Sequence, residues 1–323
     1  QKGIAPPAQR FTDNGDGTVT DNVTGLMWQQ DPGAKMTLAE AEAGAATFSL
    51  AGYSDWRLAT IKELYSLIRF DGIDPSGLAT DDTAGLVPFI DPEFFVFAYG
   101  NPSLGERIID SQFASDTRYV STTMNGDETV FGVNFADGRI KGYPLTMQGS
   151  DKTFFILYVR GNSSYGTNRL IDNGDGTIID TATGLTWMQD DSGSLGAGDT
   201  GDGSLNWEQA LAWCENLEYA GVTDWRLPDA KELQSIVDYS RAPATTGTAA
   251  IDPLFNSTAI IDEGGVVNYP FYWSGTSHAN AQSGASSAVY IAFGEAQGWM
   301  QDPWGGYTLL DVHGAGDQRS DPK

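Results

Sequence analysis

Acidic and aromatic residues are the side chains in this sequence whose types and spacing could do chemistry. The stretch DDSGSLGAGDTGDGS, at positions 190–204, carries four aspartates on a glycine-rich background. Carboxylate oxygens are ligands that Ca²⁺ prefers, and a flexible chain can fold them around one ion. We therefore take Asp190, Asp191, Asp199 and Asp202 as a candidate metal site, with Ca²⁺ as the candidate cofactor. A solvated loop without metal explains the same residues, so both interpretations stay open.

A second candidate is a group of aromatic and polar residues late in the chain. Two tryptophans stand in GEAQGWMQDPWGGY, a glycine-rich segment at positions 294–307, and another stands in YWSGT. Aromatic faces beside amide and carboxylate groups suit a sugar ring or an apolar side chain of a partner. The candidate ligand-binding residues are Trp299, Gln301, Asp302, Trp304, Tyr307 and Trp273. The same rings could instead pack the core of the protein, and this alternative stays open.

Sequence support for catalysis is thin. The chain has one cysteine, Cys214, and two histidines, His278 and His313, which are far apart in sequence. It contains no GxSxG nucleophile turn, no HExxH zinc helix and no phosphate-binding P-loop. A single cysteine also excludes an internal disulfide and a cysteine-rich metal site. We predict that the protein is not an enzyme and has no catalytic residues.

The acidity of the chain restricts its partners. It has 43 Asp and Glu against 18 Lys and Arg, a formal net charge of −25. Such a surface repels nucleic acids, sulfated polyanions and anionic lipid. No apolar run reaches the roughly 18 residues that a transmembrane helix needs. The sequence starts at Gln1 rather than Met, which together with the acidity favours an exported protein whose signal peptide has been removed.

The candidate residues sit on a sequence that is written twice. DNGDGTVTDNVTGLMW at positions 13–28 returns as DNGDGTIIDTATGLTW at 172–187, with 11 of 16 positions identical. YSDWRLATIKELYSLI at 53–68 returns as VTDWRLPDAKELQSIV at 222–237, with eight identical. Shorter echoes follow in the same order: IDPEFF and IDPLFN, YVSTT and YWSGT, VNFADG and IAFGEA, YVRG and DVHG. The chain is therefore a duplication of a unit of about 150 residues, which is too long for a solenoid repeat.

Local patterns predict the elements of each unit. NGDG between strand-forming residues predicts a tight hairpin turn, and glycines at the third and fifth ligand positions exclude an EF-hand loop there. Capping-box spacing predicts helices after Thr37, Thr60, Asn206 and Asp229. Short strands such as YVSTT, TVFGVNF and TFFILYV come later. Two helices early and antiparallel strands late predict an α+β fold.

Equivalent positions in the two copies predict core residues. Trp28 and Trp56 of the first copy correspond to Trp187 and Trp225 of the second, and we expect all four to be buried. Cys214 lies on the apolar face of a predicted helix, so we expect an inert, buried thiol. The second copy has no late strand as strong as FFILYVR in the first. Strand exchange with a partner is one way in which the second copy could be completed.

The ordered motifs resemble a known family. FTDNGDGTVTDNVTGLMW, a helix, DWRL with KEL, and a YVSTT or YWSGT strand together resemble the Lcl C-terminal domain family, in two copies that cover nearly the whole chain. The resemblance implies a C-type-lectin-like fold in exported or surface-attached bacterial proteins that act in adhesion and ligand binding. The EPN, QPD and WND motifs of calcium-dependent sugar lectins are absent. The net charge also argues against the sulfated polysaccharides linked to the adhesin that named the family.

These observations predict an organisation and two functions. We expect an N-terminal arm at 1–10, Lcl-C-like domains at 11–161 and 170–323 with a linker at 162–169, and in each domain two helices with a mainly antiparallel, loop-rich sheet. Function should lie where the copies differ, in the loops 71–117, 190–204, 239–272 and 294–307. The leading hypothesis is a secreted or cell-surface binding protein or adhesin for a glycan or protein. The alternative is a structural subunit of an extracellular fibre or assembly, whose partners are copies of itself.

Overall fold

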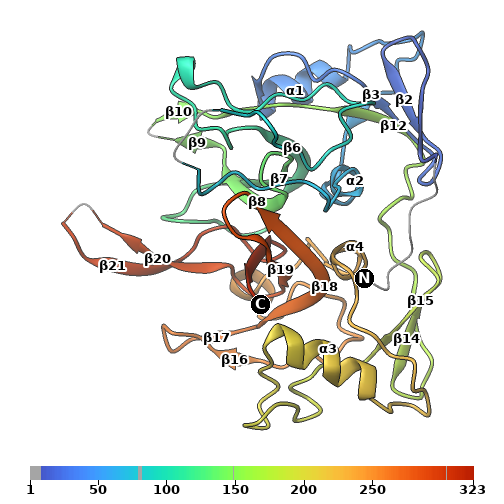
Figure 1. Ribbon diagram of the computed structural model, residues 1–323, viewed down its shortest axis with the longest axis vertical. Coiled ribbons are helices and arrows are strands. Elements are labelled where there is room, and N and C mark those ends of the chain that lie inside the picture. Colours follow the sequence, from blue (N-terminus) through green and yellow to red (C-terminus); the bar gives the residue numbers. More distant parts are fainter. Residues whose placement is uncertain (1–8, 79–81, 148, 303) are drawn as a thin grey trace.

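The chain folds into two units of similar design, here called the first unit and the second unit (Figure 1). The structure is a computed structural model that describes residues 9–78, 82–147, 149–302 and 304–323. The first unit contains β1 (Phe11–Asp13), β2 (Thr18–Asp21), β3 (Leu26–Gln29), β4 (Met36–Thr37), α1 (Leu38–Ala45), β5 (Arg57–Leu58), α2 (Ile61–Ser66), the 3₁₀ helix η1 (Pro102–Leu104), β6 (Gln112–Arg118), β7 (Thr129–Asn134), β8 (Arg139–Pro144), β9 (Thr146–Met147), β10 (Ser150–Asp151), β11 (Thr153–Phe154) and β12 (Tyr158–Gly161).

The second unit follows the same order with a different end. It contains β13 (Leu170–Asp172), β14 (Thr177–Asp180), β15 (Leu185–Met188), α3 (Trp207–Asn216), α4 (Ala230–Ser235), α5 (Pro243–Thr246), β16 (Ile260–Ile261), β17 (Val267–Asn268), β18 (Phe271–Asn280), β19 (Gly284–Ala292), β20 (Gln297–Gln301), β21 (Tyr307–Asp311) and β22 (Gln318–Pro322). Most of the regular structure is antiparallel strand, as expected, and the helices are few and short. No described helix is long and apolar enough to cross a membrane.

One sheet joins the two units. Its six strands run in the order β18-β19-β22-β8-β7-β6, so three come from each unit. The junction is the antiparallel neighbour pair β22 and β8, in which Gln318 lies opposite Ile140. The main hydrophobic cluster also combines both units, with Leu64 and Phe131 from the first and Leu233 and Phe293 from the second. The segment 162–169 connects the units, but they are packed together rather than separated by a linker.

The repeated DWRL and KEL words build the same helix start in both units. Thr60 and Asp229 cap α2 and α4 with complete capping boxes, each worth about 1 kcal/mol. The glutamate that closes each box also accepts two hydrogen bonds from the arginine of DWRL, Arg57 at 2.7 and 2.5 Å and Arg226 at 2.6 and 2.5 Å. The repeated words therefore have an architectural role.

The lysine side chain of each KEL motif forms a hydrogen bond to the other unit. Lys62 Nζ on α2 donates to the backbone oxygen of Ser235 at the end of α4, at 2.7 Å. Lys231 Nζ on α4 donates to the backbone oxygen of Ser66 at the end of α2, also at 2.7 Å. Burial lowers the pKa of Lys62 to about 8 and that of Lys231 to about 7. This reciprocal pair ties the two helices together about a local twofold relation.

The NGDG words form hairpin turns, as predicted. β1 pairs with β2 and β13 with β14, both antiparallel. In each turn one aspartate accepts hydrogen bonds from the backbone N–H and the hydroxyl of a threonine two residues later: Asp16 from Thr18, and Asp175 from Thr177. These hydrogen bonds close each turn through its own aspartate.

Two of the predicted correspondences between the copies do not hold in the structure. YWSGT lies in β18, but its counterpart is FASDT in β6, because Ser115 and Ser274 donate to the neighbouring strand and Thr117 and Thr276 accept the first N–H of α2 and α4. YVSTT follows β6 as a loop, since the ladder between β6 and β7 is irregular after Ala114. YVRG forms β12, whereas DVHG only begins at the last residue of β21 and joins no strand of the β13-β14-β15 sheet.

Candidate binding surface and cavity

The segment 294–307 contains a long, projecting hairpin. β20 and β21 pair only with each other and extend away from the body of the protein (Figure 1). Trp299 lies opposite Leu309 and Gln301 lies opposite Tyr307, so these four side chains share one face. Trp299 is 51% exposed, Tyr307 is 63% exposed and Trp304 at the tip is 91% exposed. The prediction that these rings pack the core is therefore wrong, and the alternative that they are free for a ligand is retained.

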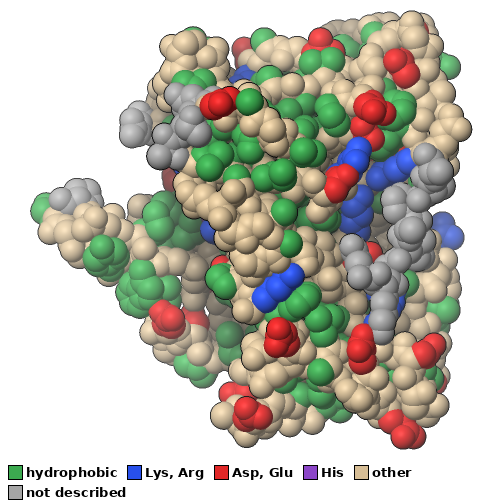
Figure 2. Space-filling model, viewed as in Figure 1, with side chains coloured by type: hydrophobic (Ala, Val, Ile, Leu, Met, Phe, Trp, Pro, Cys, Tyr) green, Lys and Arg blue, Asp and Glu red, His purple; other side chains and the backbone are tan. Residues whose placement is uncertain are grey.

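A second hairpin lies beside the first. Gln297 of β20 donates to Asp262 between β16 and β17, and the Trp299 indole N–H donates to Glu263. This hairpin also carries exposed aliphatic side chains. Figure 2 shows hydrophobic side chains, in green, on the projecting region. We call the following residues the hairpin patch: Ile261, Val266, Val267, Trp299, Trp304 and Tyr307.

Asp302 holds the hairpin tip through one of its two carboxylate oxygens. Its Oδ1 atom accepts hydrogen bonds from the backbone N–H groups of Trp304 and Gly306, at 2.8 and 2.9 Å. Gly306 also lies so close that an added Cβ would come within 2.5 Å of the Asp302 carboxylate. Asp302 therefore supports the patch by fixing the turn that presents Trp304.

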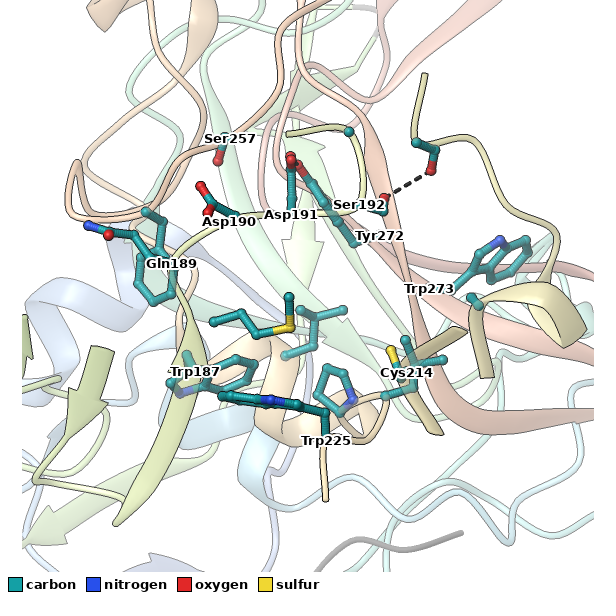
Figure 3. A pocket seen from close by; sticks show the side chains of 18 of the residues that line it. Trp187, Gln189, Asp190, Asp191, Ser192, Cys214, Trp225, Ser257, Tyr272 and Trp273 are labelled. Atoms are coloured by element: carbon teal, nitrogen blue, oxygen red, sulfur yellow. Dashed lines mark hydrogen bonds between the residues drawn. The ribbon is translucent and has the colours of Figure 1, made fainter. Parts of the chain in front are cut away.

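Trp273 is not part of the patch. It lies in β18, where its indole N–H donates to the backbone oxygen of Leu205 at 3.1 Å and its ring meets Tyr290 edge-on. There it lines a cavity of about 780 Å³ in the second unit. Trp187, Trp225 and Cys214 lie on one side of this cavity, and Asp190 and Asp191 on the other (Figure 3).

The two aspartates at the cavity rim are engaged by neighbouring side chains. Asp190 accepts hydrogen bonds from the Tyr219 hydroxyl and the Asn256 amide, at 2.9 and 2.8 Å. Asp191 accepts from the backbone N–H and hydroxyl of Thr258, and from the Tyr272 hydroxyl at 2.6 Å. Burial raises the pKa of Asp191, but these hydrogen bonds outweigh it, so the pKa lies below its usual value.

The other two predicted metal ligands do not take part in the hydrogen bonds that hold Asp190 and Asp191. Asp199 and Asp202 are exposed, and Asp202 accepts the backbone N–H of Ser204 inside its own turn. Across the described parts of the chain, no group of three or more His, Cys, Asp or Glu side chains is placed to hold a metal ion. Calcium binding thus stays a prediction without geometric support.

The residues that could suggest catalysis are buried. Cys214 is buried, as expected, and burial raises the pKa of its thiol to about 11. Burial lowers the pKa of His278 and brings that of His313 to about 3. His278 stacks on Phe89 and contacts the backbone oxygen of Asp137 of the first unit. His313 likewise contacts the backbone oxygen of Gly142, so both histidines lie where the two units pack together.

Comparison with known families places the chain. The family model of the Lcl C-terminal domain matches residues 17–160 and residues 176–308. The chain therefore belongs to the Lcl C-terminal domain family, in two tandem copies, as its motifs predicted. No curated protein and no solved structure gives a significant match.

Sequence reasoning found the hairpin aromatics but missed the cavity and the lysine pair. The signal for the cavity was the weak end of the second copy, since a missing strand leaves its neighbours uncovered. The sequence signal for the lysine pair was the repeated KEL motif. Its glutamate closes a capping box and its leucine packs in the core, so its lysine could also be expected to have a structural role. Nothing in the sequence indicated that each lysine contacts the opposite unit.

Proposed function

We propose that this protein is an exported, non-enzymatic binding protein that recognises a partner protein through the hairpin patch. The observation that carries the proposal is Trp304, 91% exposed at the tip of a projecting hairpin beside Trp299 and Tyr307. Large exposed apolar residues that are grouped mark interaction sites, and tryptophan and tyrosine dominate the energetics of such sites. A solvent-facing hairpin gains nothing for its own stability from a ring at this position.

The composition of the patch favours a protein over a glycan. Ile261, Val266 and Val267 are aliphatic and offer no hydrogen bonds to sugar hydroxyls. Sugar sites combine aromatic faces with several free polar side chains, whereas this face offers one, Gln301, and one oxygen of the Asp302 carboxylate is held by the turn. Acidic groups at the base of the patch, Asp262 and Glu263, favour a neutral or basic partner surface.

The extracellular or cell-surface location is part of the same proposal. The net charge of −25 keeps such a protein apart from polyanions and suits a soluble, exposed protein. Adhesion to a protein of another surface is then the form of binding that we favour.

Arrays of glycans and of purified extracellular proteins test the proposal. The unaltered chain is compared with the Trp299→Ala/Trp304→Ala double variant and with Leu104→Ala, a matched control at a 76% exposed apolar residue outside the patch. We expect protein ligands that the double variant loses, by roughly a hundredfold in affinity, and the control keeps. Ligands that bind the double variant unchanged would rule out the hairpin patch, and binding to glycans alone would rule out a protein partner.

A structural subunit is the second candidate, because the same patch can bind another copy of the chain. Light scattering behind a sizing column separates the two functions. A monomer near the 34.6 kDa chain mass supports a binding protein. Large particles that Trp304→Ala abolishes support a self-assembling subunit.

A further inference from the structure

The two units differ in how their small sheets are completed. In the first unit the order is β1-β2-β3-β12-β5, so β12 lies between β3 and β5. Val159 of β12 is opposite Trp28 on one side and Arg57 on the other. The corresponding sheet of the second unit is β13-β14-β15, and no described strand pairs with the free edge of β15. The N–H and C=O groups of that edge are available to another strand.

The segment 153–161 of the first unit is held by four neighbours. It pairs with β4, with β3 and with β5, and Phe155 exchanges backbone hydrogen bonds with Gln112 and Ala114 of β6. The second-unit counterparts of all four neighbours line the 780 Å³ cavity. We call them the acceptor groove: Leu205, residues 185–188, residues 226–227 and residues 271–273. The cavity thus occupies the place of a β-strand.

Equivalent apolar side chains are less buried in the second unit than in the first, as expected if the second unit lacks a strand. In the first unit the repeated leucine and tryptophan residues of the groove are buried: Leu26, Trp28, Trp56 and Leu58. Their second-unit counterparts are only half-buried: Leu185, Trp187, Trp225 and Leu227. The first unit also has its own second hydrophobic cluster, to which the strand segment contributes Phe154, Ile156 and Tyr158. The described residues of the second unit form no matching cluster.

A strand fits this site better than a small apolar molecule does. The floor of the cavity is apolar, with Trp187, Trp225 and Ala210, but one wall is the backbone edge of β15. A small ligand would cover the rings and leave the backbone groups without partners, which is costly once water is excluded. An extended peptide satisfies both, because its main chain pairs with the edge while alternate side chains enter the cavity.

We infer that the acceptor groove binds an extended β-strand whose sequence resembles that of residues 153–161, placed antiparallel to β15. Alternate bulky apolar side chains of that strand take the places that Phe154, Ile156 and Tyr158 take in the first unit. The Tyr158 hydroxyl donates to the backbone oxygen of Ala41 on α1, and the counterpart of Ala41 is Ala210 on α3, which lines the cavity. A tyrosine is therefore preferred at that position. This site is separate from the hairpin patch, so the inference does not depend on the proposed function.

The first test adds a synthetic peptide with the sequence of residues 152–162, KTFFILYVRGN, to the full chain. The peptide contains no tryptophan, so fluorescence reports the protein alone. We expect the emission of the half-exposed Trp187 and Trp225 to shift to shorter wavelength and the Tm to rise with peptide concentration, because a ligand of the folded state stabilises it. The control peptide carries Val159→Pro, which removes an N–H and does not fit a central strand. We expect it to bind at least about tenfold more weakly.

Protein variants locate the binding site. Leu227→Asp places a carboxylate in the groove, and Ala210→Phe fills the cavity, so either change should weaken the peptide about tenfold or more. Leu104→Ala, outside the groove, should bind the peptide as the unaltered chain does. The inference is overturned if both peptides behave alike, or if the groove variants bind as tightly as the control.

A covalent form of the test provides the strand at high local concentration. β22 takes the place of β8, since Gln318 lies opposite Ile291 as Ile140 lies opposite Val133. Lys323 then corresponds to Leu145, so the sequence of residues 146–162, which leads from β8 to the groove in the first unit, is joined after Lys323. We expect a higher Tm than that of the same fusion with Val159→Pro. Equal Tm values for the two fusions would contradict the inference.

Discussion

The first unit and the second unit begin alike and end differently. Hairpin, capping box and Arg–Glu pair are the same in both, with distances that agree within about a tenth of an ångström for the hydrogen bonds of the turns. At the end, the first unit closes its small sheet with β12, whereas the second unit inserts the β20–β21 hairpin before β22 and leaves β15 open. The two units therefore share the hairpin and helix starts at their beginnings. The differences at their ends provide both candidate sites, the hairpin patch and the acceptor groove.

The shared sheet also shows that the two units are not independent domains. β22 lies between β19 and β8, and the main hydrophobic cluster crosses the junction. The predictions below test where the units behave alike and where they do not, beginning with the largest effect.

Deleting residues 318–323 removes β22 and should have the largest effect. The six-stranded sheet would be split at its centre, and the buried Gln318, whose side chain accepts from the Tyr65 hydroxyl, would be lost. We expect both units to lose stability together, with no folded chain at 37 °C or a single transition at a much lower Tm. Calorimetry of the full chain should show one cooperative transition. Two separate transitions, or an unchanged Tm for the deletion, would mean that the units fold alone.

Replacing equivalent tryptophans should have unequal effects. Trp28→Ala removes a fully buried ring and should destabilise the protein by about 3–5 kcal/mol. Trp187 is half-buried in the acceptor groove, so Trp187→Ala should cost roughly half as much. Denaturant unfolding measures both values. Equal losses of unfolding free energy for the two variants would contradict the open groove. A larger loss for Trp187→Ala when the strand peptide is present would show that the peptide covers Trp187.

The lysine pair makes stability depend on pH. Lys231 has a pKa of about 7 in the folded protein, well below the usual value near 10.5. Between these two values the unfolded chain binds a proton that the folded chain does not, so stability rises with pH, by about 1 kcal/mol per unit. Lys231→Met should remove most of this rise between pH 7.5 and 9. Lys62→Met should remove less, because the pKa of Lys62 is lowered only to about 8.

Denaturant unfolding at pH 7.5 and pH 9 measures these slopes. Leu104→Ala serves as the control that keeps the slope of the unaltered chain. A slope that neither lysine variant changes would show that both lysines stay charged at neutral pH, held by the backbone oxygens that they contact.

The local elements could be predicted because their causes are local. Capping boxes, NGDG turns and the apolar helix faces depend on residues within a few positions of one another, and all four predicted helices begin where their caps stand. The hairpin aromatics were found because a glycine-rich segment with tryptophans is unusual in composition. Their exposure could not be predicted, since it depends on whether a surface elsewhere in the chain covers them.

The features that failed depend on contacts distant in sequence. Lys62 meets the oxygen of Ser235, 173 positions away, and Gln318 meets Ile140 across the junction of the units. YVSTT and YWSGT share letters but occupy different places, because YWSGT lies within β18 whereas YVSTT follows the last residue of β6. The spacing of motifs along the chain does not predict the order in which strands from two units pair in one sheet.

The smallest effect should come from the turn that the two units share most closely. Asp16→Ala and Asp175→Ala each remove hydrogen bonds to a threonine at nearly identical distances, so each should lower the denaturant midpoint slightly and by a similar amount. Denaturant unfolding should give closely similar midpoint shifts for the two variants, because the hydrogen bonds that they lose are equivalent. The double variant should show the sum of the two shifts, because the effects of distant residues without shared partners usually add. A calcium role for either turn would instead appear as a difference between the two variants that chelator abolishes, and it would show that the repeated words carry chemistry as well as architecture.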